Sequence, residues 1–198
     1  MNAPTDPTQP VWPAMLTWRA PDVSRMESVR VYLSGKRIRA NGRIVAAATA
    51  ANPAFGAFYE VQTDESGATK RFGLTVTLAE RERQLAISRD EENMWLISDH
   101  HGERREGFNG ALDVDVVFSP FFNALPIRRL DLQHQADSIA LPMVYVHVPD
   151  MTVSAAIVNY TSTGSLDGIK LRSPVADTTV TADADGFIVD YPGLAERI

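Results

Sequence analysis

Short segments in which apolar and polar residues alternate recur along almost the whole chain, separated by turn residues. From Leu112 to Phe118 every second residue is apolar, and Asp113 and Asp115 stand between them, as in a β-strand with one apolar face. Comparable strand patterns cover residues 29–33, 36–49, 58–63, 71–79, 84–89, 94–98, 143–148, 153–161, 169–172, 178–182 and 187–191. The connections are too short for helical crossovers, so the sequence predicts an antiparallel sheet.

A sheet this wide twists and closes on itself. We therefore predict a mainly β protein: a single-domain curved antiparallel sheet, a spiral roll or half-barrel, with one or two short helices. One helix is expected over residues 125–132, with Pro126 near its start, as part of a lid or plug. Residues 99–106 are interpreted as a charged loop, and Asn41-Gly42 as a bulge in preference to a hairpin turn. Four prolines predict a flexible tail over residues 1–13, so the β-roll domain spans 14–198.

Composition excludes several classes of function. The formal net charge of −6 argues against nucleic-acid binding, which needs a concentrated positive surface. The chain has no cysteine, no stretch of ~20 apolar residues and no signal-peptide pattern, so we predict a cytoplasmic protein without a transmembrane segment. A monomer or small homo-oligomer is expected. No cofactor is predicted, and no metal site, because the His100-His101 pair lacks a third ligand nearby.

A polar site is expected beside the apolar surface around residue 115. Asp113 and Asp115 share one strand face, and Arg128 and Arg129 follow the Ser119-Pro120 break. Such an arrangement suits recognition of an amphiphile. The alternative is that the aspartates face solvent or form a structural ion-pair cluster with the arginines. The pattern leaves open which arginine points inward.

Other polar and aromatic residues lie near the ends of predicted strands. Trp18 could stack on a sugar ring beside Glu27, although a core tryptophan whose N–H meets a carbonyl is the alternative. Tyr145 shares a strand face with His147, which could be a general base or a histidine hydrogen-bonded on the sheet. The predicted ligand-binding residues are Trp18, Glu27, Tyr59, Asp113, Asp115, Asn123, Arg128 and Tyr145.

Several segments in order carry a resemblance to a known family. They are Leu16-Thr-Trp-Arg, Glu27-Ser28, Tyr59-Glu-Val-Gln-Thr-Asp64, the stretch GALDVDVVFSPFFNALPIRRL from residue 110 to 130, and the ending from residue 183 to 198. From about Leu16 to its last residue the chain resembles a bacterial domain-of-unknown-function family labelled "putative glycolipid-binding". The resemblance implies a fold similar to that of lipoprotein carriers and a lipid or glycolipid as partner.

The leading functional hypothesis is a non-enzymatic lipid- or glycolipid-binding protein that holds an acyl chain in a hydrophobic cavity with a polar Asp/Arg/Trp rim. Each buried methylene contributes ~0.8 kcal/mol, so a ten-carbon chain could supply up to about 8 kcal/mol before ordering costs. The alternative is a hydrolase-like enzyme that uses a carboxylate pair on an amphiphilic or sugar substrate. A third hypothesis is a scaffold whose concave side is filled by its own side chains.

Overall fold

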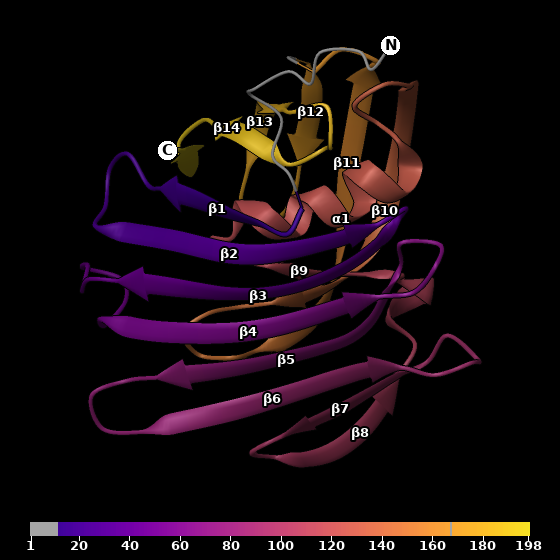
Figure 1. Ribbon diagram of the computed structural model, residues 1–198. Coiled ribbons are helices and arrows are strands. Elements are labelled where there is room, and N and C mark those ends of the chain that lie inside the picture. Colours follow the sequence, from indigo (N-terminus) through magenta and orange to yellow (C-terminus); the bar gives the residue numbers. More distant parts are fainter. Residues whose placement is uncertain (1–11, 167) are drawn as a thin grey trace.

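The computed structural model describes residues 12–166 and 168–198, and their strands form one sheet of fifteen (Figure 1). The strands and helices are β1 (Ala14–Arg19), β2 (Arg25–Ser34), β3 (Arg37–Ala46), β4 (Phe55–Thr63), β5 (Thr69–Thr77), β6 (Glu82–Arg89), β7 (Trp95–Asp99), β8 (Gly102–Glu106), the 3₁₀ helix η1 (Phe108–Gly110), β9 (Asp113–Val116), α1 (Pro120–Leu130), β10 (Ala136–Val146), β11 (Val153–Thr163), β12 (Ile169–Arg172), β13 (Asp177–Ala182), β14 (Ile188–Tyr191) and β15 (Ala195–Arg197).

The strand order is β8-β7-β6-β5-β4-β3-β2-β1-β15-β14-β13-β12-β11-β10-β9. This open, curved sheet with one α-helix confirms the predicted fold class. One pair differs from the expected antiparallel arrangement, because β9 runs parallel to β10. The physical reason is that α1 connects these two strands, and a parallel pair needs such a crossover.

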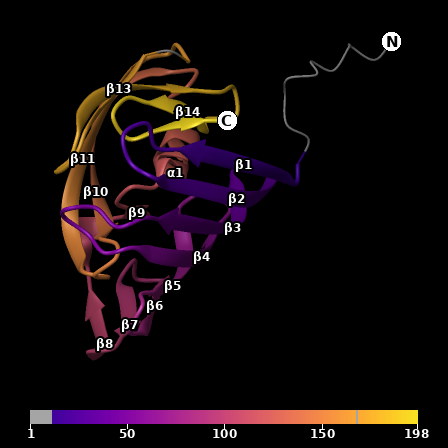
Figure 2. The same cartoon turned by 90° about the vertical axis from the view of Figure 1, so that its left-hand side faces the viewer.

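Helix α1 occupies the concave side of the sheet. Figure 2 shows it between β1 and β2 on one side and β10 and β11 on the other. The helix begins at Pro120, directly after Ser119, and includes Pro126 in its interior, so the predicted range of 125–132 was too short and displaced. All eight residues from Pro120 to Ile127 are buried. The concave side is therefore filled by α1, where the sequence had suggested an apolar hollow.

The apolar face of each alternating strand is turned toward α1. In β2 this buried face carries Glu27 together with Val29 and Val31, and in β4 it carries Tyr59 together with other apolar side chains. Because successive strand residues point to opposite faces, Glu27 must project into the core. The fold thus carries a carboxyl group into an apolar interior.

Gly42 lies in the middle of β3, in regular register with both neighbouring strands. The Asn41-Gly42 pair therefore forms neither the bulge nor the hairpin turn considered from the sequence. A Cβ atom at residue 42 would lie 2.1 Å from Cζ of Tyr59. Glycine is required there because the Tyr59 ring passes directly over the backbone.

We expect Gly42→Ala to lower the free energy of unfolding by about 1–3 kcal/mol, because the added methyl group must displace the Tyr59 ring. Gly73→Ala in β5 is the matched control, since a Cβ atom added at residue 73 would meet nothing within 4 Å. Urea unfolding of the two variants measures the difference. Equal stability of the two would contradict the close approach of Tyr59 to β3.

Two further segments bear on the sequence predictions. Residues 102–106, interpreted as part of a charged loop, form the edge strand β8, which is largely exposed along its length and so lacks an apolar phase. The predicted tail lies mostly in residues 1–11, outside the described residues. Trp12 is described, and its ring lies 5.2 Å from that of Phe187.

Candidate functional site

A cleft of about 370 Å³ lies where β9 passes into α1, facing β10 and the turns that follow β12 and β14. Its volume falls at the lower end of the range of about 300–1,000 Å³ found for small-molecule sites. We call it the polar cleft. It is lined by Asp115, Val116, Val117, Phe118, Ser119, Asn123, Tyr145, Ser173, Val175, Ala176, Asp177, Thr178, Tyr191, Pro192, Gly193 and Leu194.

Asp115 is the unusual member of the polar cleft. Its side chain is almost wholly buried, with the residue 7% exposed, yet within the described residues no group forms a hydrogen bond or ion pair with its carboxyl. Burial, with a smaller contribution from the charge of Asp113, raises the pKa of Asp115 to about 7. A buried carboxyl without a partner is costly, and a ligand that donates hydrogen bonds would offset this cost.

Two tyrosines and an asparagine surround this carboxyl in the cleft. Burial and the nearby Asp115 charge raise the pKa of Tyr145 to about 12, and the same causes raise the pKa of Tyr191. The side chain of Ser173 acts against both of these rises in pKa. Asn123, from the first turns of α1, carries an Oδ1 atom without a hydrogen-bond partner in the described structure. The cleft therefore combines hydroxyl groups and aromatic surface, which suits a sugar.

Asp113 lies outside the polar cleft. Its carboxylate accepts hydrogen bonds from Nη2 and Nε of Arg129, at 2.6 and 3.2 Å. Arg129 is thus the arginine that reaches β9. The Arg128 side chain is equally buried and lies over Phe187, and neither arginine lines the polar cleft. The enzymatic hypothesis needed Asp113 and Asp115 together at one cleft, and this arrangement gives it no support.

Behind the cleft lies a buried polar cluster of Glu27, Tyr59 and Ser119. Oε1 of Glu27 accepts hydrogen bonds from the Tyr59 hydroxyl and, at 2.6 Å, from the Ser119 hydroxyl. Burial raises the pKa of Glu27 to about 7, although both hydrogen bonds act against the rise. Ser119 also lines the polar cleft, so it connects the cluster to the candidate site.

A second pocket of about 390 Å³ adjoins the polar cleft and shares Val117, Phe118 and Val175 with it. Most of its lining is apolar, and we call it the apolar pocket. Val175 is 58% exposed at the shared rim. The apolar pocket is lined by Asn52, Pro53, Leu78, Arg81, Val117, Phe118, His147, Val148, Pro149, Asp150 and Val175.

The predicted site residues divide into three groups. Three of them line the cleft: Asp115, Asn123 and Tyr145. Two more, Glu27 and Tyr59, lie behind the cleft and are connected to it by the hydrogen bond between Ser119 and Glu27. The other three predicted residues lie outside the cleft. Asp113 is bound to Arg129, and the buried Trp18 indole donates to the carbonyl of Ile188 at 2.8 Å. Arg128 lies over the Phe187 ring and donates to the carbonyl of Asp185.

Sequence reasoning missed Ser119, Ser173 and Tyr191 as members of the cleft. Ser119 was recognised only as part of the Ser-Pro break, although a strand that stops at a serine before a helix places that side chain at the junction. Ser173 and Tyr191 gave no comparable signal, because they reach the cleft from the turn after β12 and from the end of β14, far along the chain.

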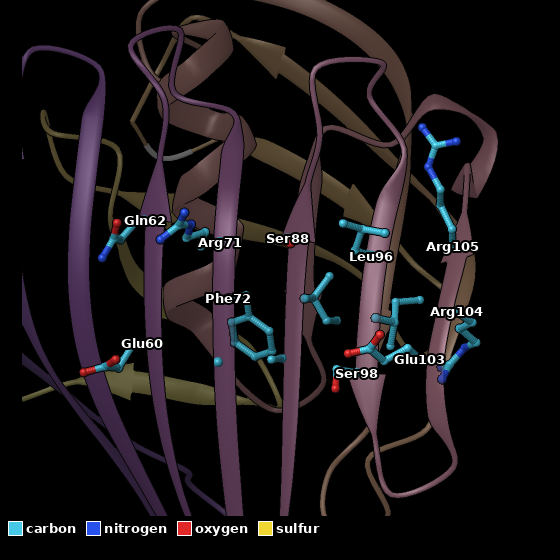
Figure 3. A pocket seen from close by; sticks show the side chains of 14 residues that line it. Glu60, Gln62, Arg71, Phe72, Ser88, Leu96, Ser98, Glu103, Arg104 and Arg105 are labelled. Atoms are coloured by element: carbon cyan, nitrogen blue, oxygen red, sulfur yellow. The ribbon is translucent and has the colours of Figure 1, made fainter.

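A larger hollow of about 710 Å³ lies on the outer face of the sheet, across β4 to β8 (Figure 3). The side chains of Arg104 and Arg105 at its edge are bound by the protein's own carboxylates, those of Asp99 and Asp90 among them. Its guanidinium groups on β8 are therefore already paired. The polar cleft, with its unpaired carboxyl, is the better candidate for the functional site.

None of the described helices is both long and apolar enough to span a membrane. No protein of known, curated function matches the sequence. Among solved structures, the fold is similar to the crystal structure of a DUF1089 family protein from Pseudomonas aeruginosa, determined at 1.80 Å resolution. That chain is 22% identical, the TM-score is 0.71, and the similarity covers 91% of this chain and 95% of that one. The model of the family described as "Putative glycolipid-binding" matches residues 15–197, and the chain therefore belongs to this family.

Proposed function

We propose that this protein binds a glycolipid, with the sugar head group in the polar cleft and the first part of the hydrocarbon chain in the apolar pocket. The observation that carries the proposal is that the Asp115 carboxyl, in a cleft that adjoins an apolar pocket, has no hydrogen-bond or ion-pair partner among the described residues. Membership of the family supports the ligand class. Lipid or glycolipid is thus the proposed partner, held at the rim of the sheet and outside the filled concave side.

The head group would meet both donors and acceptors in the cleft. The phenols of Tyr145 and Tyr191 and the hydroxyl of Ser173 can exchange hydrogen bonds with sugar hydroxyls, and Asp115 can accept from them. Tyrosine rings also offer apolar surface to the faces of a sugar. Asp115, Tyr145 and Tyr191 are held by β9, β10 and β14, and Ser173 by the turn that follows β12, so the site is largely preformed.

Affinity should increase with the length of the alkyl chain on a simple glycoside. Each methylene group that enters the apolar pocket contributes ~0.8 kcal/mol, which corresponds to about a fourfold tighter Kd. Isothermal titration of hexyl, heptyl and octyl β-glucosides below their micelle concentrations measures this series. Equal affinities along the series would show that the hydrocarbon stays in water and would reject the apolar pocket as its site.

The location of the hydrocarbon can be tested at the shared rim. Val175→Asp would place a carboxylate against the alkyl chain, and desolvating it should weaken binding of octyl glucoside about tenfold or more. Val45→Asp on β3 is the control, because Val45 is 65% exposed and lies outside both pockets. Lipid extraction and native mass spectrometry of protein purified from cells test the proposal directly. Empty protein that also fails to bind the glucosides would overturn it.

The cytoplasmic location and the monomeric or small homo-oligomeric state remain predictions from the sequence. Fractionation of cells and sedimentation of the purified protein measure them.

A further inference from the structure

Resting on the proposed function, we infer that the head group carries a primary ammonium group beside its sugar ring and that Asp115 binds it. The inference depends on the balance of donors and acceptors in the polar cleft. Two acceptors, the Asp115 carboxyl and Oδ1 of Asn123, lack a donor among the residues that the structure describes. An ammonium group is the complementary ligand, since it offers three donors and no acceptor.

The charged side chains near Asp115 are engaged with other groups, so we assign the pairing of its carboxyl to the ligand. Asp113, its neighbour on β9, is already bound to Arg129. Asp177 is on β13 across the cleft, and its Oδ2 atom lies 3.8 Å from Nε of Arg172. Arg25 lies near the edge of the cleft, but it donates to the Leu194 carbonyl and packs over the Phe118 ring. No described cation therefore pairs with Asp115.

The tyrosines near Asp115 add neutral hydroxyl groups, which can donate as well as accept, and no positive charge. Tyr145, Tyr160 and Tyr191 come from β10, β11 and β14. Oγ of Ser173 accepts hydrogen bonds from the backbone N–H groups of Val175 and Ala176, while the hydroxyl of Tyr160 has no hydrogen-bond partner in the described structure. A neutral sugar would leave the Asp115 charge uncompensated in this setting, whereas an ammonium group would compensate it at a single contact.

The test compares octyl β-glucoside with two amino analogues, in which an ammonium group replaces the hydroxyl at the second or at the sixth carbon. Titration at a pH of about 8 should show at least one amino analogue binding about tenfold or more tightly than the neutral glucoside, the range for a hydrogen bond to a charged group. Asp115→Asn keeps the shape of the side chain, and the ratio of the Kd of the neutral glucoside to that of the amino analogue should then be close to one. Asp190→Asn, which changes an exposed carboxylate on β14 outside both pockets, should preserve the wild-type ratio.

The outcomes separate the two proposals. If all three glucosides bind equally, the ammonium inference is overturned while glycolipid binding stands. If none binds, the proposed function itself fails. Retention of the preference in Asp115→Asn, with a cooperative unfolding transition showing that the variant is folded, would also overturn the role of Asp115.

Discussion

The free energy of unfolding is expected to fall by about 3 kcal/mol through Asp115 alone as the pH rises from about 5 to about 8. Burial raises the pKa of Asp115 to about 7 in the folded protein, from an ordinary value of 3.8. Between these two values the folded state holds a proton that the unfolded chain has released. Stability from this proton is complete below the unfolded pKa and is lost as the pH rises through the folded pKa.

Glu27 acts in the same direction. Burial raises the pKa of Glu27 in the folded protein from 4.5 to about 7. Its titration therefore lowers the free energy of unfolding by a similar amount over the same pH range. The pKa of Asp113 is also raised by burial, in spite of Arg129. The protein should therefore be more stable in mild acid than above neutral pH, in contrast to proteins whose buried carboxylates are all well paired.

Urea unfolding of the wild type and of Asp115→Asn at both pH values measures the effect. The variant should lose about half of the pH dependence. Asp90→Asn is the control, because hydrogen bonds from Arg105 lower the pKa of Asp90 and its titration lies below this range. Stability that rises between pH 5 and 8, or an unchanged slope in Asp115→Asn, would show that Asp115 is not a buried, unpaired carboxyl.

Replacement of Phe122 by alanine is expected to cost about 3–5 kcal/mol of stability. Phe122 is 1% exposed, and its ring lies 5.0 Å from Tyr59, 5.5 Å from Phe72 and 5.4 Å from Phe121. Removing it would leave a cavity in the centre of the concave side, since α1 and the sheet hold each other in place. Urea unfolding at constant pH measures the loss.

Phe58→Ala is the matched control on the opposite face of the sheet. Phe58 is 37% exposed and packs under Arg43, so its removal should cost about 1 kcal/mol or less. A Phe122→Ala variant as stable as Phe58→Ala would mean that the concave side is not filled by α1. In that case an acyl chain could enter the hollow that the sequence had suggested.

The same unit of structure supports both the interior and the candidate site. The segment from β9 through Ser119 into α1 supplies Asp115, Ser119 and Asn123 to the polar cleft, and α1 then places Phe121 and Phe122 in the core. Movement of α1 would disturb the cleft. Variants in the helix therefore need a measurement of stability beside any measurement of binding.

Local patterns predicted the strands well, because alternation of apolar and polar residues reflects a pleated strand with one buried face. They failed for the edge strand β8, which is exposed along both faces and lacks that contrast. They predicted β9 as a strand, but β9 is buried along both faces, so its two aspartates do not form an exposed polar face. Helix α1 was placed too late because two prolines, Pro120 and Pro126, obscured a start directly after Ser119.

By itself the sequence determined the mainly β class, the strand boundaries that follow alternation, and the presence of carboxyl groups in strands, because each depends on residues near one another in the chain. Only the tertiary structure decided which carboxyl is paired. Arg129 pairs with Asp113, whereas Asp115 lies beside Tyr145 and Tyr191 with no cation paired to it in the described part of the chain, since pairing depends on how α1, β10 and β14 meet around β9. It also decided that the concave side is filled, because the volume left inside a curved sheet depends on where α1 packs.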